Sequence, residues 1–207
     1  MKIVLLCDTD QKDELTAQGV STLAELIFVD DPAFLATIKP AICIDLLFDN
    51  SQERINKLVK HSEIIIVNSV LDTLNQLPSG FIRINGWNTF LQRPVVEASA
   101  PAAIKEKAEK IFLLFSKKIE WVADICGFIS ARVVASIINE AYFTLEEGVS
   151  TKEEIDIAMK LGTNYPYGPF EWSKKIGLKN IYRLLTSLSA EQTRYTPAVL
   201  LTKEATT

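Results

Sequence analysis

The sequence predicts an α/β fold, with an N-terminal unit built on a parallel sheet and an all-helical unit after it. Short runs rich in Val and Ile alternate with helical patterns through residues 1–120, which is typical of consecutive βαβ units. These runs stop at Asp124, and from Gly127 onward the apolar residues recur at helical spacing. A chain of 207 residues is long enough for two small cores. We therefore expect two domains, residues 1–123 and 124–207.

The strands expected in the first unit are apolar on both faces, as in a sheet that helices cover on both sides. Ser51 is a typical N-cap residue and predicts the start of one helix. The expected strands are Lys2–Cys7, Leu26–Val29, Ile42–Phe48, Ile64–Val67, Phe81–Trp87, Val95–Ala98 and Ile119–Val122. The expected helices are Lys12–Gln18, Pro32–Ile38, Ser51–Lys60 and Ala102–Ser116.

The second unit is expected to begin with a long, mostly buried helix. Its apolar stripe ends at Gly148, a residue that commonly stops helices. Thr151 and Glu154 have the spacing of a capping box and predict a second helix. A third helix is expected near residues 178–188. Between these two helices, residues 165–170 contain two prolines and a glycine, which predicts a rigid loop.

Charge, hydropathy and cysteine usage exclude several classes of protein. The net charge is −4 and no basic cluster opposes it, so we expect no nucleic-acid partner. No apolar run approaches the roughly 20 residues that cross a bilayer, and the first run meets Asp8 too soon for a signal peptide. The sequence therefore predicts a cytoplasmic protein without membrane contact. Cys7, Cys43 and Cys126 are odd in number and widely spaced, which predicts buried free thiols and no metal site. The single histidine, His61, is expected at the surface.

Several short motifs occur in a fixed order along the second unit. They are Gly127–Arg132, Asn139–Ala141, Glu147–Val149, Ile155-Asp156, Ala158–Gly162, Pro166–Glu171, Ile176–Leu178 and Arg194–Pro197. Together they closely resemble the C-terminal domain of 3-hydroxyacyl-CoA dehydrogenases. The resemblance implies a helical domain of the 6-phosphogluconate dehydrogenase C-terminal type, preceded by a reduced, degenerate Rossmann-like dinucleotide-binding domain. It also implies a homodimer that forms through the helical domain.

The resemblance extends over most of residues 42–201 and locates four positions of the family's active site. The segment from Gly86 to Glu97 resembles the stretch that holds the family's catalytic histidine and the carboxylate partner of that histidine. The four positions are Asn88 for the histidine, Glu97 for its partner, Val70 for a substrate-contacting serine and Ala131 for an asparagine. Only Glu97 keeps the family's residue type.

The NAD site that the resemblance implies lacks its sequence fingerprint. A dinucleotide-binding turn is rich in glycine, because backbone N–H groups must approach the pyrophosphate at the start of a helix. No glycine occurs in residues 8–14, whereas Asp8, Asp10 and Asp13 bring negative charge there. We therefore expect no bound NAD, assign no cofactor-binding residue after Cys7, and expect no other cofactor.

These substitutions predict a 3-hydroxyacyl-CoA dehydrogenase-like protein of acyl-CoA and fatty-acid metabolism that lacks normal NAD-dependent activity. An amide at Asn88 cannot accept the hydroxyl proton at neutral pH, and Val70 and Ala131 offer no side-chain hydrogen bond. Two alternatives stay open. One is an active oxidoreductase on 3-hydroxyacyl-CoA, with Glu97 as the base of an atypical site. The other is a non-catalytic module that binds an acyl-CoA or a nucleotide, or that keeps only the dimer surface.

Overall fold

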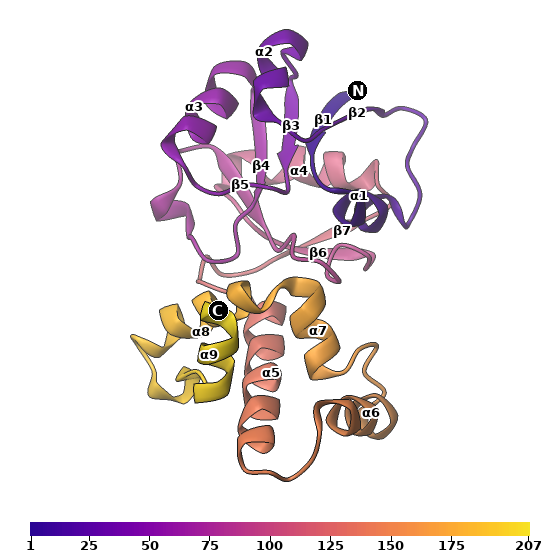
Figure 1. Ribbon diagram of the computed structural model, residues 1–207. Coiled ribbons are helices and arrows are strands. Elements are labelled where there is room, and N and C mark those ends of the chain that lie inside the picture. The colour runs from indigo at the N-terminus through magenta and orange to yellow at the C-terminus, as the bar shows by residue number, and fades with distance from the viewer. The chain divides into compact units, whose positions relative to one another are not determined.

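The computed structural model describes residues 1–207 and divides them into two compact units, Met1–Phe128 and Ile129–Thr207 (Figure 1). Residues 124–128, which the sequence assigned to the helical unit, thus belong to the first unit. Two contacts hold them there. The buried Arg83 guanidinium donates to the Asp124 carboxylate at 2.6 Å, and the Gly127 N–H donates to the Val70 carbonyl at 2.8 Å. The units are described separately below.

The first unit is built on a seven-stranded sheet with the order β2-β1-β3-β4-β5-β6-β7. All seven expected strands are present: β1 Lys2–Leu6, β2 Glu25–Val29, β3 Ile42–Asp45, β4 Ile64–Asn68, β5 Phe81–Ile84, β6 Val95–Ser99 and β7 Lys118–Trp121. The strands pair in parallel, as predicted, except that β5 and β6 are antiparallel. The prediction was wrong for this pair because residues 85–94 turn the chain back without a crossover helix.

The order of the strands places a topological switch point between β1 and β3. The chain passes from β1 to β2 on one side of β1 and then returns to β3 on its other side. In open α/β sheets, ligands bind outside the carboxyl ends of the strands at such a point. The end of β3 is therefore relevant to function. It lies at Asp45, earlier than predicted, because the Asp45 carboxylate accepts the Leu47 N–H at 3.0 Å and turns the chain.

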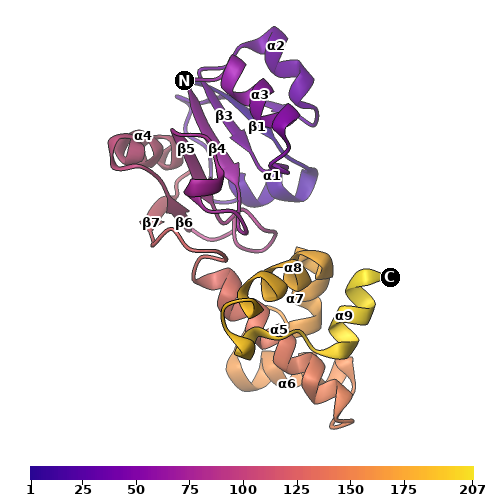
Figure 2. The same cartoon turned by 90° about the vertical axis from the view of Figure 1, so that its left-hand side faces the viewer.

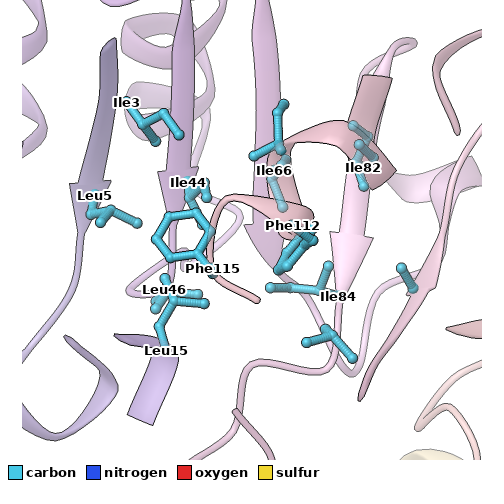
Figure 3. Close-up of a cluster of buried hydrophobic side chains, with 14 of the residues drawn as sticks. Ile3, Leu5, Leu15, Ile44, Leu46, Ile66, Ile82, Ile84, Phe112 and Phe115 are labelled. Carbon is cyan, nitrogen blue, oxygen red and sulfur yellow. The ribbon is translucent and has the colours of Figure 1, made fainter. Parts of the chain in front are cut away.

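Helices cover both faces of the sheet (Figure 2). Leu35 and Leu58, from α2 and α3, pack on the face that carries Val4 and Val67. On the other face, α1 and α4 cover the isoleucine side chains of the strands, and Figure 3 shows Phe112 and Phe115 packed over them. The helices of this unit are α1 Thr9–Thr16, η1 Pro32–Phe34, α2 Leu35–Ile38, α3 Gln52–His61, η2 Leu74–Gln76 and α4 Ala102–Leu113.

The second unit is all-helical, as predicted. Its elements are α5 Ser130–Glu146, α6 Lys152–Thr163, α7 Pro169–Ile176, α8 Leu178–Ser189, η3 Thr193–Tyr195 and α9 Val199–Thr206. The capping box of Thr151 and Glu154 is confirmed at the start of α6. The predicted rigid loop is wrong at its end, because Pro169 is the first residue of α7, a position where a proline costs no hydrogen bond. Neither α7 nor α9 was among the predicted helices.

The remaining expectations concern single side chains. Cys7 and Cys43 are buried thiols, as predicted, whereas Cys126, which also forms no disulfide, is only half-buried. His61 ends α3 and is half-buried, so the prediction of a surface position was only partly right. None of the helices combines the length and the apolar character that a membrane span requires.

Candidate functional site

Three of the four family-derived positions lie on neighbouring strands of the first unit. Val70 follows β4, Asn88 follows β5 and Glu97 lies on β6. Because β4, β5 and β6 are consecutive in the sheet, the fold brings these three segments to one region. The fourth position, Ala131, is a fully buried residue of α5 in the second unit.

The Glu97 carboxylate has a partner that the sequence analysis missed. The Asn85 Nδ2 group donates to Glu97 Oε2 at 3.2 Å, and the Asn85 backbone N–H donates to the Glu97 carbonyl at 3.0 Å. Asn85 is 2% exposed, and its Oδ1 atom is buried without a hydrogen-bond partner. The pairing follows from the antiparallel register of β5 and β6, which sets Ile84 opposite Ala98. Residue spacing alone does not reveal that register.

The loop that carries Asn88 is fixed on both sides of this residue. The Gly86 N–H donates to Asn68 Oδ1 at 3.0 Å. The Thr89 N–H donates to both carboxylate oxygens of Glu14, at 2.7 and 2.8 Å, and Thr89 has a left-handed backbone with φ of 80°. These two anchors hold Asn88 in a half-buried position. An amide held there can donate and accept hydrogen bonds, but it cannot take up a proton.

A buried lysine anchors the continuation of the same loop. The Lys117 Nζ atom donates to the carbonyls of Leu91 and Arg93, at 2.5 and 2.9 Å, and the residue is fully buried. Burial lowers the pKa of Lys117 to about 8, and the Glu14 carboxylate opposes this shift. Lys117 therefore lies near the candidate site, but it donates to two backbone carbonyls, and its role is to hold the loop.

Val70 and Ala131 stand where the family has a serine and an asparagine, and neither brings a polar side chain to the site. Val70 is 3% exposed, and its carbonyl accepts hydrogen bonds from the Gly127 N–H and from the guanidinium of Arg83. Its backbone therefore stabilises the end of the first unit, while its side chain packs in the interior. The methyl group of Ala131 is also buried. Neither side chain can polarise the carbonyl of a substrate.

The residues around α1 do not fit the pyrophosphate of NAD. Asp8 is the N-cap of α1, and its Oδ1 atom accepts the Gln11 N–H at 2.8 Å. The Gln11 side chain accepts the Asp8 N–H at 3.1 Å. The chain's own side chains therefore use the helix N-terminus where a dinucleotide fold binds phosphate, and a carboxylate stands there. Asp30, which follows β2, does fit a dinucleotide, because a carboxylate at that place binds the ribose in such folds. The N–H groups at the start of α1, in contrast, suit a capped helix and not a bound anion.

Polar motif residues of the second unit connect its helices. Asn139, which is buried on α5, donates to the Thr196 carbonyl and accepts the Ala198 N–H, both at 2.9 Å. Asp156 on α6 accepts the N–H groups of Phe170 and Glu171, at 2.8 and 3.1 Å, and so caps α7. The motifs that identify this unit thus hold its fold together.

An apolar groove of about 390 Å³ lies between α5 and α6. Its lining includes Ile137, Glu140 and Ala141 from α5, and Ile155 and Met159 from α6. On the same helix α6, Ile157 is 53% exposed and Leu161 is 83% exposed. Helix α6 therefore borders an apolar groove and also exposes two large apolar side chains.

Comparisons with known proteins support one family. Residues 127–206 match the family described as 3-hydroxyacyl-CoA dehydrogenase, C-terminal domain. The chain is 38% identical to 3-hydroxyadipyl-CoA dehydrogenase of Escherichia coli K12 over 117 residues, which cover 54% of this chain and 25% of that protein. It is 31% identical to a 3-hydroxybutyryl-CoA dehydrogenase of Clostridioides difficile over 183 residues, which cover 77% and 65%. The matched segments thus span between a quarter and two thirds of these relatives.

The fold of the whole chain also has a solved counterpart. The crystal structure of FadB2 of M. tuberculosis superposes with a TM-score of 0.76 and covers 99% of this chain and 93% of that one. Sequence identity between the two is 16%, so this likeness concerns the fold.

Proposed function

Because the chain belongs to the 3-hydroxyacyl-CoA dehydrogenase family, we propose that it keeps the family's architecture but not the NAD-dependent oxidation of a 3-hydroxyacyl thioester. One observation carries the proposal. The carboxylate that would support a catalytic imidazole, Glu97, is instead hydrogen-bonded to the amide of Asn85. Oxidation of the alcohol transfers a hydride to the cofactor and releases the hydroxyl proton, which a base must accept. Neither Asn85 nor Asn88 can accept it.

The missing polar groups lower the expected activity further. Donors aimed at the forming carbonyl oxygen are commonly worth about 10²–10³-fold in rate each. The buried Val70 and Ala131 supply no side-chain donor. The chain is therefore proposed to be a pseudoenzyme of acyl-CoA metabolism.

The direct test is NADH oxidation with acetoacetyl-CoA, followed by absorbance. We expect a rate no higher than the background without protein, with the Clostridioides difficile relative assayed in parallel as the active control. Robust turnover would overturn the proposal and favour the alternative in which Glu97 is the base. In that case Glu97→Gln should abolish NADH oxidation. An unchanged rate of oxidation would show that Glu97 is not the base.

A second proposed function is self-association through the α5–α6 surface. The exposed apolar side chains of α6 support it, and the apolar groove beside that helix is a second apolar feature, because exposed apolar surface commonly marks interfaces. We expect light scattering to give the mass of a dimer, and Leu161→Glu to give a monomer. Leu23→Glu is the matched control, since Leu23 is 72% exposed in the first unit. A monomeric wild-type chain, or a dimeric Leu161→Glu variant, would contradict this assignment.

An acyl-CoA ligand is the remaining alternative for a non-catalytic role. Calorimetry with acetoacetyl-CoA tests it with the same protein. Heat of binding without turnover would favour a binding module, whereas no heat would leave the association surface as the proposed function.

A further inference from the structure

The strands β1, β3, β4 and β5 are neighbours in the sheet (Figure 1). A continuous chain of hydrogen bonds joins their carboxyl ends. After β1, the Asp8 N–H donates to Gln11 Oε1 at 3.1 Å, and Gln11 Nε2 donates to the Leu46 carbonyl after β3 at 3.0 Å. Asn68, at the end of β4, donates to the same carbonyl at 3.1 Å, and its Oδ1 atom accepts the Gly86 N–H after β5 at 3.0 Å. We call Asp8, Gln11, Leu46, Asn68 and Gly86 the carboxyl-edge network.

The network crosses the switch point between β1 and β3. Gln11 is 5% exposed, so the bond between Gln11 and Leu46 is a buried bridge between the ends of these two strands. The backbone adds a second link, since the Leu46 N–H donates to the Leu6 carbonyl at 2.7 Å. In an open α/β sheet this is the crevice that receives a nucleotide. Here the amide side chains of Gln11 and Asn68 bridge the strand ends.

The network has no spare hydrogen-bonding capacity in its centre. The Leu46 carbonyl accepts two side-chain donors, which uses both of its lone pairs. Gly86 also fits tightly, because a Cβ atom there would lie 2.9 Å from the Asn68 side chain. A ligand could enter only if these bonds broke, and breaking the buried bond between Gln11 and Leu46 would leave a polar group without that partner.

We propose that the carboxyl-edge network closes the dinucleotide crevice from within, so that Gln11 and Asn68 replace a bound nucleotide as the link between the strand ends. This inference goes beyond the loss of catalysis. It concerns the binding of nucleotides, whereas the proposed inactivity rests on the absent base near Glu97.

The test compares Gln11→Glu with Gln52→Glu in the full chain. At position 11 a glutamate still accepts the Asp8 N–H, but it loses the donor and places a carboxylate oxygen against the Leu46 carbonyl. Gln52→Glu is the same substitution at an exposed position of α3. We expect Gln11→Glu to lower the midpoint of thermal unfolding by about 5 °C and Gln52→Glu to leave it within about 1 °C. Equal midpoints would overturn the proposal.

If Gln11→Glu does not fold, the wild-type chain gives a second measurement. A ligand that binds the folded state raises the midpoint of unfolding. We expect no rise with NAD or ADP at millimolar concentration. A rise with either one would show an open crevice and overturn the proposal, while an absent turnover in the same sample would leave the proposed inactivity standing.

Discussion

Gly168 and the carboxylate of Asp156 are in such close contact that no side chain fits between them. A Cβ atom on Gly168 would lie 2.3 Å from the Asp156 carboxyl group. This carboxylate reaches past Gly168 to accept the N–H groups of Phe170 and Glu171 in the first turn of α7. The glycine of the family motif Pro166–Glu171 is thus required by a helix cap that comes from a different helix.

We expect Gly168→Ala to destabilise the protein by more than about 2 kcal/mol, because the methyl group must displace the cap. Urea unfolding measures the effect. Gly162→Ala is the control, since Gly162 lies in α6 and a Cβ atom there would meet nothing within 4 Å. Alanine favours a helix, so this control should be neutral or stabilising by up to about 1 kcal/mol. Equal effects of the two substitutions would contradict the close contact.

Lys117 should make stability depend on pH in the alkaline range. Its pKa is about 8 in the folded chain, against an ordinary value of 10.5. Between these two values the unfolded chain binds more protons than the folded chain, so stability rises with pH. Below about pH 8 the lysine is charged in both states, and the full cost of burying the cation is present.

Comparison of variants isolates this effect from other groups. Burial raises the pKa of Cys7 to about 11, which opposes the trend equally in all variants. We expect the free energy of unfolding of wild type, relative to Lys117→Met, to increase between about pH 8 and about pH 10. The exposed Lys110 provides the control, and Lys110→Met should follow the wild-type curve. Parallel curves for wild type and Lys117→Met would contradict the lowered pKa.

Arg83 should be among the most sensitive positions of the first unit. It is fully buried, donates to the carbonyls of Ser69 and Val70, and stacks 4.1 Å from the ring centroid of Phe128. Arg83→Met removes the guanidinium donors to these carbonyls and to the Asp124 carboxylate. We expect a loss of about 3 kcal/mol or more.

Hydrogen exchange locates the effect of the same substitution. Amides of residues 124–128 should exchange faster in Arg83→Met than in wild type, because that segment loses its anchor. Arg93→Met removes an exposed arginine and should change stability by no more than about 0.5 kcal/mol. If residues 124–128 kept their protection, another contact would hold them in the first unit.

Replacing the lost imidazole should not by itself restore activity. In Asn88→His, the Glu97 carboxylate still has the Asn85 amide as a partner, and the carboxyl-edge network is intact. We expect NADH oxidation with acetoacetyl-CoA to stay at background, both for this variant and for Asn88→His combined with Asn85→Ala. Activity of the single variant would show that the histidine was the only missing part.

Local chemistry explains which elements could be predicted from the sequence. Ser51 and Thr151 cap the helices that they predict, because capping involves residues only three positions apart. The prediction was wrong for the start of α1, which lies at Thr9 and not at Lys12. Asp8 and Gln11 form a capping box, and this local spacing indicates the observed start at Thr9.

Long-range register explains what could not be predicted. The contact of Asn85 with Glu97 depends on the register in which β6 pairs with β5, and no pattern along the chain determines that register. The short connection without a helix indicates only that the two strands run antiparallel. The network through Leu46 likewise depends on a backbone carbonyl, which has no signature in the sequence. The family resemblance located the substituted positions, but only the structure shows their present partners.

Asn139 has a consequence for the order in which the helical unit forms during synthesis. It lies on the first helix of that unit, and its two hydrogen-bond partners are 57 and 59 residues further along the chain. A ribosome releases α5 well before those partners, and the Asn139 amide must stay hydrated until they arrive, since burying it unpaired is costly. The nascent helical unit is therefore expected to remain open, and sensitive to proteases, until residues 196–198 have emerged and close it in one late step.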